Sequence, residues 1–455
     1  MTWTAAPFAA IPIAVLAVLS AVVVLQQRRT PQSAAAWLLF IVFLPYLAIP
    51  FFVILGFRKR TSRFEPIAFD TAVDPRPDQT VARDAVVPAS YGIPAATGGN
   101  SLKIVRAGEE AFVELIRLCR SARTDLQCLF YLVADDAVGQ AFVEELIARA
   151  EAGVSVRLLL DRLGNLKPPR RSLDALKAAG GEVRYFSPLL QLPEKGHLNL
   201  RNHRKMVIAD GARVFAGGMN VGTEYMGPDP SPDRWTDLAY LIEGPAVATF
   251  RDVFRSDWGT TGGALSQAGT GWPGTAAGGA RVQLVPSGPD TAGDPLHDTL
   301  VNAIHSARRR VWLATPYFLP TEFLGNALSI AAKRRVDVRV LLPQTSNQKL
   351  ADFARGAYLR DMQDAGCRIE FFQGGMLHAK AGVIDDIGYL GSANFDVRSM
   401  LLNFETTLFV YDPGSVQALA DWYRLQEERC TSGLPPAGFF RRISEGVFRL
   451  GAPVL

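Results

Sequence analysis

The sequence predicts an α/β protein in which two similar domains follow an N-terminal pair of membrane-spanning helices. Three observations lead to this fold class: an uncharged apolar N-terminus, strand-like apolar runs that alternate with helix-like segments, and a second half that repeats the order of the first. The chain has 455 residues, more than one hydrophobic core usually serves, so several compact units are expected.

The N-terminus is the most apolar part of the chain. No charged side chain occurs in residues 1–27, and residues 4–25 would extend about 33 Å as a helix, enough to cross a hydrocarbon core. A second uncharged run covers residues 30–57, in which Pro45 and Pro50 predict a kink. We therefore expect a transmembrane hairpin at residues 1–60.

Basic residues predict the orientation of this hairpin. A cleaved signal peptide carries basic residues before its apolar stretch, whereas Arg28 and Arg29 follow it here, which argues against cleavage. The second apolar run is followed by more basic residues than the loop contains: Arg58, Lys59, Arg60 and Arg63. Because Lys and Arg favour the cytoplasmic side, both ends of the hairpin should be cytoplasmic.

Charge and cysteine content narrow the possible partners only a little. The net charge of +4 and the pI near 8.9 suit an anionic lipid surface but do not by themselves indicate nucleic acid. The four cysteines lack the spacing of a metal site and are too few for a disulfide scaffold, so reduced thiols are expected.

The chain behind the hairpin divides into two repeats. Residues 61–100 form a predicted linker, 101–258 a first repeat, 259–280 a Gly/Ala/Thr-rich linker, 281–430 a second repeat and 431–455 a tail of unknown role. Two pairs of segments echo each other: VSVRLLLD at 154–161 answers VDVRVLLP at 336–343, and GEVRYF at 181–186 answers CRIEFF at 367–372. Internal duplication predicts two similar domains about a pseudo-twofold axis.

Each repeat then reaches the same polar motif, H-x-K-x4-D. An extended segment sends His and Lys, two positions apart, to one side, so both can face a single anion. The Asp stands at the end of the strand, where it fixes the turn more plausibly than it transfers a proton. The two copies are His203, Lys205 and Asp210, and His378, Lys380 and Asp385.

A small-residue loop follows each motif and ends in asparagine. The loops read Gly-Gly-Met-Asn at 217–220 and Gly-Ser-Ala-Asn at 391–394. Glycine lets the backbone approach a phosphate closely, and an amide can donate to a phosphate oxygen. The candidate phosphate-binding residues are therefore Asn220, Ser392 and Asn394.

The paired motifs resemble those of the phospholipase D superfamily, over roughly residues 1–430. The segments RNHRK, GGMNVGTEY, VQLVPSGPD and GSANFDVRS, together with RRTPQSAAAWLLFIVFLPY in the hairpin, are similar to bacterial cardiolipin synthases in particular. One departure is FYLVADD at 130–136, where the family usually has a Tyr-Tyr-Ile-like stretch. The resemblance implies two phospholipase D-like domains that form one catalytic unit.

The resemblance also implies a mechanism without metal or cofactor. One histidine attacks phosphorus and the other serves as acid and base; we assign His203 and His378 to these roles, with the reverse left open by the near-symmetry. The two lysines and asparagines of the motifs would hold the phosphate oxygens. Each histidine also needs a carboxylate on its second ring nitrogen: Glu405 in the second half and Asp237, preferred to Glu224, in the first.

The resemblance implies a phosphatidyltransferase that makes cardiolipin from two phosphatidylglycerols and releases glycerol. Hydrolysis to phosphatidic acid, or synthesis from phosphatidylglycerol and phosphatidylethanolamine, would use the same residues. The hairpin and modest charge argue against a nuclease or another nucleic-acid partner, and two intact motifs argue against a non-enzymatic scaffold. The expected location is the bacterial cytoplasmic membrane with the catalytic domains on the cytoplasmic side; the oligomeric state stays open.

Overall fold

The computed structural model describes residues 6–26, 31–55, 64–70, 86–186, 200–263 and 276–450. The chain forms two compact units. The smaller unit contains the N-terminal residues up to Arg63 together with residues 187–200, and the larger unit contains residues 64–186 and 201–455.

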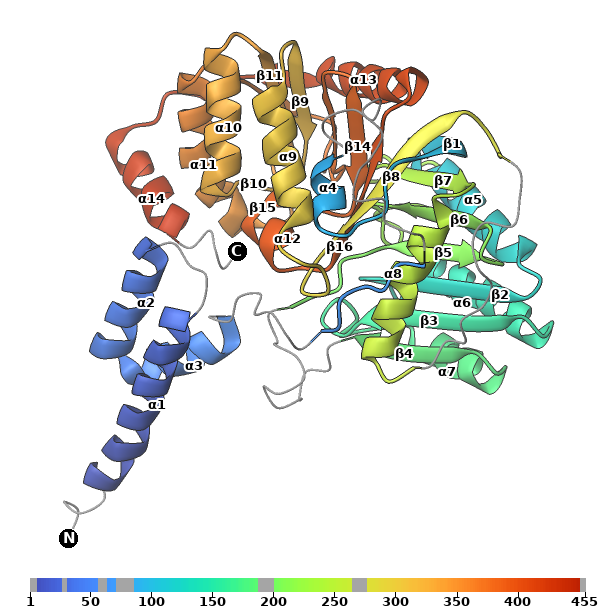
Figure 1. Cartoon of the computed structure of the whole chain (residues 1–455), viewed down its shortest axis with the longest axis horizontal. Coiled ribbons are helices and arrows are strands. Elements are labelled where there is room, and N and C mark those ends of the chain that lie inside the picture. Colours follow the sequence, from blue (N-terminus) through green and yellow to red (C-terminus); the bar gives the residue numbers. More distant parts are fainter. Residues whose placement is uncertain are drawn as a thin grey trace. The chain divides into compact units, whose positions relative to one another are not determined.

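The described part of the N-terminal unit contains three helices, α1 (Ala6–Gln26), α2 (Pro31–Phe43) and α3 (Pro45–Leu55) (Figure 1). Pro45 begins a new helix after a one-residue break, and Pro50 lies inside α3, in accord with the predicted kink. The helices share a small apolar core in which Trp37 packs edge-on against Phe52. None of the helices within the described ranges is both long and apolar enough to span a membrane.

The larger unit is built on a sheet of fifteen strands whose order reflects the predicted duplication. From the centre outward, the first repeat runs β1-β7-β6-β5-β2-β3-β4 and the second runs β8-β16-β14-β13-β9-β11-β12. The two halves meet where β1 pairs antiparallel with β8, so the pseudo-twofold axis passes through this junction. The first-repeat strands are β1 (Thr97–Val105), β2 (Asp125–Phe130), β3 (Ser155–Asp161), β4 (Glu182–Phe186), β5 (Met206–Ala209), β6 (Arg213–Gly217) and β7 (Ala239–Glu243).

The second repeat uses equivalent strands in the same order. The echoed segments of the sequence form β3 and β11, and β4 and β12, which are parallel neighbours in each half. A short strand, β17 (Cys430–Ser432), extends the outer edge beyond β12. The strands are β8 (Ala280–Ser287), β9 (Arg310–Ala314), β11 (Asp337–Pro343), β12 (Arg368–Phe372), β13 (Ala381–Ile384), β14 (Ile387–Gly391) and β16 (Glu405–Val410), and a separate pair joins β10 (Phe318–Leu319) to β15 (Phe395–Asp396).

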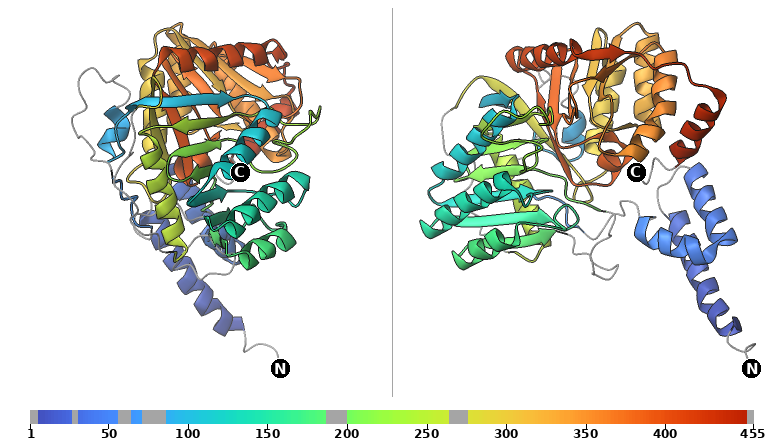
Figure 2. Two further views of the ribbon diagram at one scale, coloured as in Figure 1. Left: turned by 90° about the vertical axis from the view of Figure 1, so that its right-hand side faces the viewer. Right: turned by 180° about the vertical axis from the view of Figure 1, so that it is seen from behind.

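Helices lie on both faces of the sheet, as the three views show (Figures 1 and 2). Each repeat has its own apolar core between strands and helices, so the cores are as duplicated as the strands. The helices of the first repeat are α5 (Gly108–Ser121), α6 (Ala137–Glu151), α7 (Arg170–Ala178) and α8 (Val247–Thr260). Those of the second are α9 (Pro295–Ser306), α10 (Glu322–Lys333), α11 (Lys349–Asp364), α12 (Val397–Leu401), α13 (Pro413–Glu427) and α14 (Phe439–Leu450).

The segment at 61–100 differs from the plain linker that its composition predicts. Residues 86–90 form a short helix, α4 (Val86–Ser90), and β1 already begins at Thr97. Ile93 is fully buried in the core of the second repeat, and the amide of Ile67 donates to the carbonyl of Asp290. The described part of this segment is therefore packed on the second repeat. Most of the predicted linker at 259–280, residues 264–275, lies outside the described residues.

Candidate active site

The two motifs meet because each one is bound to the backbone of the other repeat. His203 and His378 stand three residues before β5 and β13. The amide of His203 donates to the carbonyl of Phe404 (2.8 Å), and the amide of His378 donates to the carbonyl of Thr236 (2.7 Å). Short parallel bridges, Asn202 to Phe404 and Thr236 to Leu377, repeat this exchange. The backbone thus carries both histidines to the boundary between the repeats.

The carboxylates beside the histidines also cross between the repeats. Nδ1 of His203 lies 3.1 Å from both carboxylate oxygens of Glu405 and 3.0 Å from the carbonyl of Ser392. Nδ1 of His378 lies 2.6 Å from Oδ2 of Asp237. Both carboxylates were predicted from the sequence, each as the partner of the histidine in its own repeat. This pairing is wrong, because each carboxylate contacts the histidine of the other repeat. Glu224 contacts neither histidine in the described hydrogen bonds and is partly solvent-exposed.

Asp237 and Glu405 occupy equivalent places, but their surroundings differ. Each carboxylate residue is followed by one whose carbonyl accepts from the motif loop, Gly218 N to Leu238 O (3.0 Å) and Ser392 N to Thr406 O (2.9 Å). A Cβ on Gly218 would lie only 2.4 Å from Oδ1 of Asp237. The first repeat therefore has no room for a side chain where the second has serine.

The hydroxyl of Ser392 contacts a carboxylate in this structure. Its hydroxyl donates to Oε2 of Glu405 at 2.6 Å and accepts from the amide of Thr406 at 3.0 Å. Because the hydroxyl donates this hydrogen bond to Glu405, it orients the carboxylate, which in turn orients His203. The predicted contact of Ser392 with phosphate stays a prediction, and this positioning contact is what the structure adds.

The two lysines are buried beside their histidines. Lys205 is 1% exposed and donates to the carbonyl of His203 at 2.7 Å; Lys380 is 3% exposed and bonds to the carbonyl of His378. Nζ of Lys380 also lies 2.7 Å from Nδ1 of His378. Because Nδ1 of His378 donates a hydrogen bond to Asp237, it cannot also accept one from Lys380. We therefore take the carbonyl of His378 as the acceptor for Lys380. Burial lowers the pKa of Lys205 to about 7 and that of Lys380 to about 8.

Burial and charge also shift the histidines and their carboxylates. Burial, reinforced by Lys380, lowers the pKa of His378 to about 3 against the opposing charge of Asp237. Burial likewise lowers the pKa of His203 in spite of Glu405. Burial opposes ionisation of both carboxylates, but the neighbouring lysines and histidines keep their pKa values below the ordinary range. Without substrate the site therefore holds neutral imidazoles beside ionised carboxylates.

Nδ1 of each histidine contacts a carboxylate oxygen, of Glu405 for His203 and of Asp237 for His378, so we assign the ring proton to Nδ1 in both. Each Nε2 is then left with its lone pair. His203 is the more accessible of the two, with its side chain 13% exposed against 6% for His378. Aromatic rings enclose both histidines: Tyr131 lies against His203, and Tyr225 and Trp235 lie against His378. The sequence analysis missed these aromatic contacts.

The motif asparagines lie at equivalent places at the ends of the loops. Asn220 and Asn394 are both buried, and Oδ1 of each has no hydrogen-bond partner within the described part of the chain. A buried polar atom without a partner is unfavourable, and here it recurs in both repeats. The structure brings these amides into the motif loops, and their role in holding phosphate stays a prediction.

The motif aspartates lie at the opposite ends of β5 and β13 from the histidines, roughly 20 Å along an extended chain. Oδ1 of Asp210 accepts from the amides of Thr124 (2.8 Å) and Asp125 (3.1 Å), and Asp385 accepts in the same way from residues 308–310. Both aspartates have positive φ, 51° and 49°, which fits the predicted turn. They fasten the starts of β2 and β9, as the predicted role in the turn requires, and any further role in catalysis stays a prediction.

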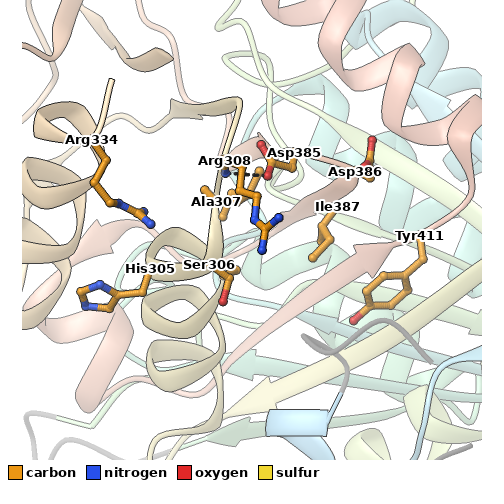
Figure 3. Close-up of a pocket in the computed structure, with 11 residues that line it drawn as sticks. His305, Ser306, Ala307, Arg308, Arg334, Asp385, Asp386, Ile387 and Tyr411 are labelled. Atoms are coloured by element: carbon orange, nitrogen blue, oxygen red, sulfur yellow. Dashed lines mark hydrogen bonds between the residues drawn. The ribbon is translucent and has the colours of Figure 1, made fainter. Parts of the chain in front are cut away.

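A hollow in the second repeat surrounds Asp385 and not the histidines. Figure 3 shows His305, Arg308, Arg334 and Asp385 around this hollow of about 650 Å³, with the bond from the Arg308 amide to Asp385. No motif histidine or lysine lines it. We therefore place the chemistry at the junction of the repeats.

Arg204 is a positioning residue that the sequence analysis passed over. Its side chain is fully buried and pairs with Asp257 (2.8 Å) and, through both terminal nitrogens, with Asp290 (2.7 and 2.9 Å). Its Nε donates to the carbonyl of Glu405 at 3.2 Å. Arg204 thus ties the first motif to α8, to the turn after β8 and to the backbone of Glu405. The alternation of side chains along a strand was the available signal, since Arg204 must point away from His203 and Lys205.

Comparisons with known proteins identify the family to which this sequence is similar. The family model described as cardiolipin synthase, phospholipase D-like domain, matches residues 115–258 and 300–425, more than half of the chain. A second model, phospholipase D-nuclease N-terminal, matches residues 15–56. A cardiolipin synthase from Halalkalibacterium halodurans is 30% identical over 100% of this chain and 95% of its own. One from Geobacillus thermodenitrificans is 32% identical over 96% of this chain and 91% of its own.

Solved structures share the fold at much lower identity. A phosphatidylserine synthase from Haemophilus influenzae has a TM-score of 0.59 at 14% identity, covering 78% of this chain and 95% of its own. A polyphosphate kinase from Porphyromonas gingivalis has a TM-score of 0.51 at 12% identity, covering 87% of this chain and 57% of its own. These likenesses concern the fold alone. The family match and the full-length relatives go further, and this chain belongs to the cardiolipin synthase family with phospholipase D-like domains.

Proposed function

We propose that this enzyme transfers phosphatidyl groups between phospholipids and makes cardiolipin from two phosphatidylglycerol molecules, with release of glycerol. The observation that carries the proposal is the pair of histidines at the junction of the repeats, each bound through Nδ1 to a buried carboxylate of the other repeat. This arrangement occurs in a chain that is similar over its full length to bacterial cardiolipin synthases.

The first half of the proposed reaction is a displacement at phosphorus. Nε2 of His203 uses its lone pair to form the N–P bond, and the bond from phosphorus to the headgroup glycerol oxygen breaks. His378 gives its Nε2 proton to that oxygen, and glycerol leaves. Glu405 stabilises the positive charge that develops on His203, because it already accepts the Nδ1 proton. The greater exposure of His203 supports its choice as the nucleophile.

The second half returns the proton. His378 takes the proton of a hydroxyl on the second phosphatidylglycerol, the alkoxide oxygen attacks phosphorus, and the N–P bond of His203 breaks. His378 must therefore be protonated at the start, although its pKa is about 3 in the free site. The phosphate diester brings a negative charge into this buried place, which favours the imidazolium and raises that pKa on binding. Lys205, Lys380, Asn220 and Asn394 would hold the nonbridging oxygens.

Transfer differs from hydrolysis only in the acceptor, and the burial of the site supports transfer. Both lysines are at most 3% exposed, and aromatic rings cover both histidines, so water reaches the phosphohistidine poorly. Labelled phosphatidylglycerol in mixed micelles, with and without phosphatidylethanolamine, tests the proposal. Cardiolipin should form with one glycerol released per two donors. Phosphatidic acid as the main early product would contradict transfer, and cardiolipin formed only with phosphatidylethanolamine would change the substrate pair.

We further propose that residues 1–60 anchor the enzyme in the bacterial cytoplasmic membrane as a two-pass hairpin, with the catalytic repeats on the cytoplasmic side. The support is the absence of charge in residues 1–27 and 30–57, the excess of basic residues at 58–63, and the N-terminal family match at 15–56. A periplasm-only reporter should be active when fused near Gln32 and silent after Arg63. The opposite pattern would overturn the orientation.

A further inference from the structure

The C-terminal helix α14 packs on the protein in an unusual way. At roughly 100° per residue, its side chains separate into two faces. One face carries Arg441, Glu445, Phe448 and Arg449 and packs against α11; the other carries Phe439, Phe440, Ile443 and Val447. A surface helix normally buries its apolar face and exposes its charges. In α14 the packed face holds the buried Glu445 beside Phe448, and four large apolar side chains are left on the exposed face.

Ion pairs fix the orientation of α14. Glu445 is 3% exposed and accepts from Arg360 on α11 (2.8 Å) and from Arg441 (3.0 Å). It lies against Gly356, where a Cβ would come within 2.6 Å of its carboxylate. Arg449 pairs with Asp361 at 2.8 Å. Because these contacts set the rotation of the helix, the apolar face is held outward by the fold.

The outward face is strongly apolar and exposed. The exposed fractions are 73% for Phe439, 84% for Phe440, 49% for Ile443 and 60% for Val447. Arg442, also exposed, stands at the border between the two faces. A helix with aromatic and aliphatic residues on one face and arginines beside them is the type that lies in the interface of an anionic membrane. An aqueous surface gives these four side chains nothing to pack against.

α14 is also connected to the second motif. Phe448 packs in a small cluster with Tyr317, Leu319 and Ala354. Leu319 belongs to β10, which pairs with β15, and β15 follows directly after Asn394 of the motif loop. A surface bound to α14 would therefore be connected to β15, the strand that begins directly after the candidate phosphate ligand Asn394.

We infer that α14 is an interfacial helix that docks the second repeat on an anionic phospholipid surface, with Phe439, Phe440, Ile443 and Val447 in the acyl-chain region and arginines at the headgroups. This gives the tail at 431–455, whose role the sequence leaves open, a definite task. It also deepens the proposed function, because both substrates are drawn from the same surface to which α14 binds.

A site-specific probe on the full-length protein tests the inference. An environment-sensitive fluorophore is attached to Phe440→Cys in a Cys430→Ser background, since the other three cysteines are buried. Leu425→Cys on α13 is the matched control, because Leu425 is an exposed apolar residue too (55%). In vesicles of phosphatidylglycerol and phosphatidylethanolamine, acyl-chain spin-labelled lipid should quench the probe at 440 several-fold more than at 425, and aqueous iodide should do the reverse.

Two outcomes would overturn the inference. Equal iodide quenching at both positions would show that α14 stays in water. Shielding of position 440 from both quenchers would show that protein, either the N-terminal unit or a second copy, covers the helix. This arm needs no turnover, so it can fail while the proposed function stands.

An activity arm connects the helix to catalysis. Phe440→Asp should raise KM for vesicle phosphatidylglycerol about tenfold, as the lost burial of one aromatic side chain predicts, and should leave kcat on short-chain soluble lipid unchanged. Leu425→Asp should change neither. An unchanged vesicle KM in Phe440→Asp, despite normal expression, would also count against docking by α14.

Discussion

Glu405 of the second repeat holds Nδ1 of His203 of the first, with both carboxylate oxygens at 3.1 Å. Asp237 of the first repeat holds His378 of the second in return. The candidate site is therefore completed only when both repeats are folded and joined. Residues from one repeat fix the ring tautomer that the other repeat needs for its chemistry.

Both histidines should be indispensable. His203→Ala and His378→Ala are each expected to lower the rate of phosphatidyl transfer by about 10⁴ or more, because neither ring can both attack phosphorus and move the headgroup proton. Thermal unfolding of the variants beside wild type would show that the fold survives. In excess chelator the wild type should retain its rate, since lysines supply the positive charge; loss of activity restored by Mg²⁺ would contradict the mechanism.

The unequal loops predict unequal responses to substitution. Ser392→Ala removes the hydroxyl that donates to Glu405 and should lower kcat about tenfold, the value of one hydrogen bond to a charged group. Ser392→Thr keeps the hydroxyl and should recover part of the loss. Gly218→Ser should cost more than Ser392→Ala, because its Cβ would meet Asp237. Equal kcat in wild type and Ser392→Ala would refute the positioning contact.

Arg204 should matter more for stability than for chemistry. Arg204→Met leaves Asp257 and Asp290 buried without their partner and should lower the free energy of unfolding by about 3–5 kcal/mol. Adding Asp257→Asn and Asp290→Asn removes the stranded charges and should restore much of the thermal midpoint. If the single variant melts with wild type, the network does not hold the two repeats together as described.

The buried lysines predict an alkaline limit to substrate capture. Lysine is charged below its pKa, so raising the pH through about 7 and about 8 removes the positive charges of Lys205 and Lys380 from the free enzyme. A plot of kcat/KM should therefore begin to fall near pH 7 and fall more steeply above roughly pH 8. Bound phosphate favours the charged lysines, so kcat should keep its value to higher pH. A kcat/KM that stays flat from pH 7 to pH 9 would contradict this assignment.

Much of the fold could be predicted because local patterns specify it. The echoed segments form β3 and β11, and β4 and β12, at equivalent places in the two repeats. These segments are apolar because their strands are buried in the core, so their composition and their repetition along the chain were enough to predict them. The order of strands at the junction depends on pairing between residues far apart, such as Thr97 with Val282, which no local pattern contains.

The same limit explains the errors at the site. Asp237 and Glu405 could be found from their distance to the motifs, but the sequence does not say which histidine each one meets, because that depends on how two repeats exchange strand ends. Ser392 was predicted to bind phosphate because it carries a hydroxyl group. In the structure this hydroxyl donates a hydrogen bond to Glu405. Arg204 could have been predicted from the alternation of side chains along an extended segment, but only its neighbours His203 and Lys205 were considered.

The exchange of carboxylates has a consequence for the ancestry of this chain. A single repeat could have built such a centre only as a homodimer, and its two carboxylates would then have been the same residue by necessity. Once both copies lay in one gene, each could mutate without its twin. Aspartate beside Gly218 and glutamate beside Ser392 are two solutions that a homodimer could not combine, and together they give the two histidines different environments within one symmetric frame.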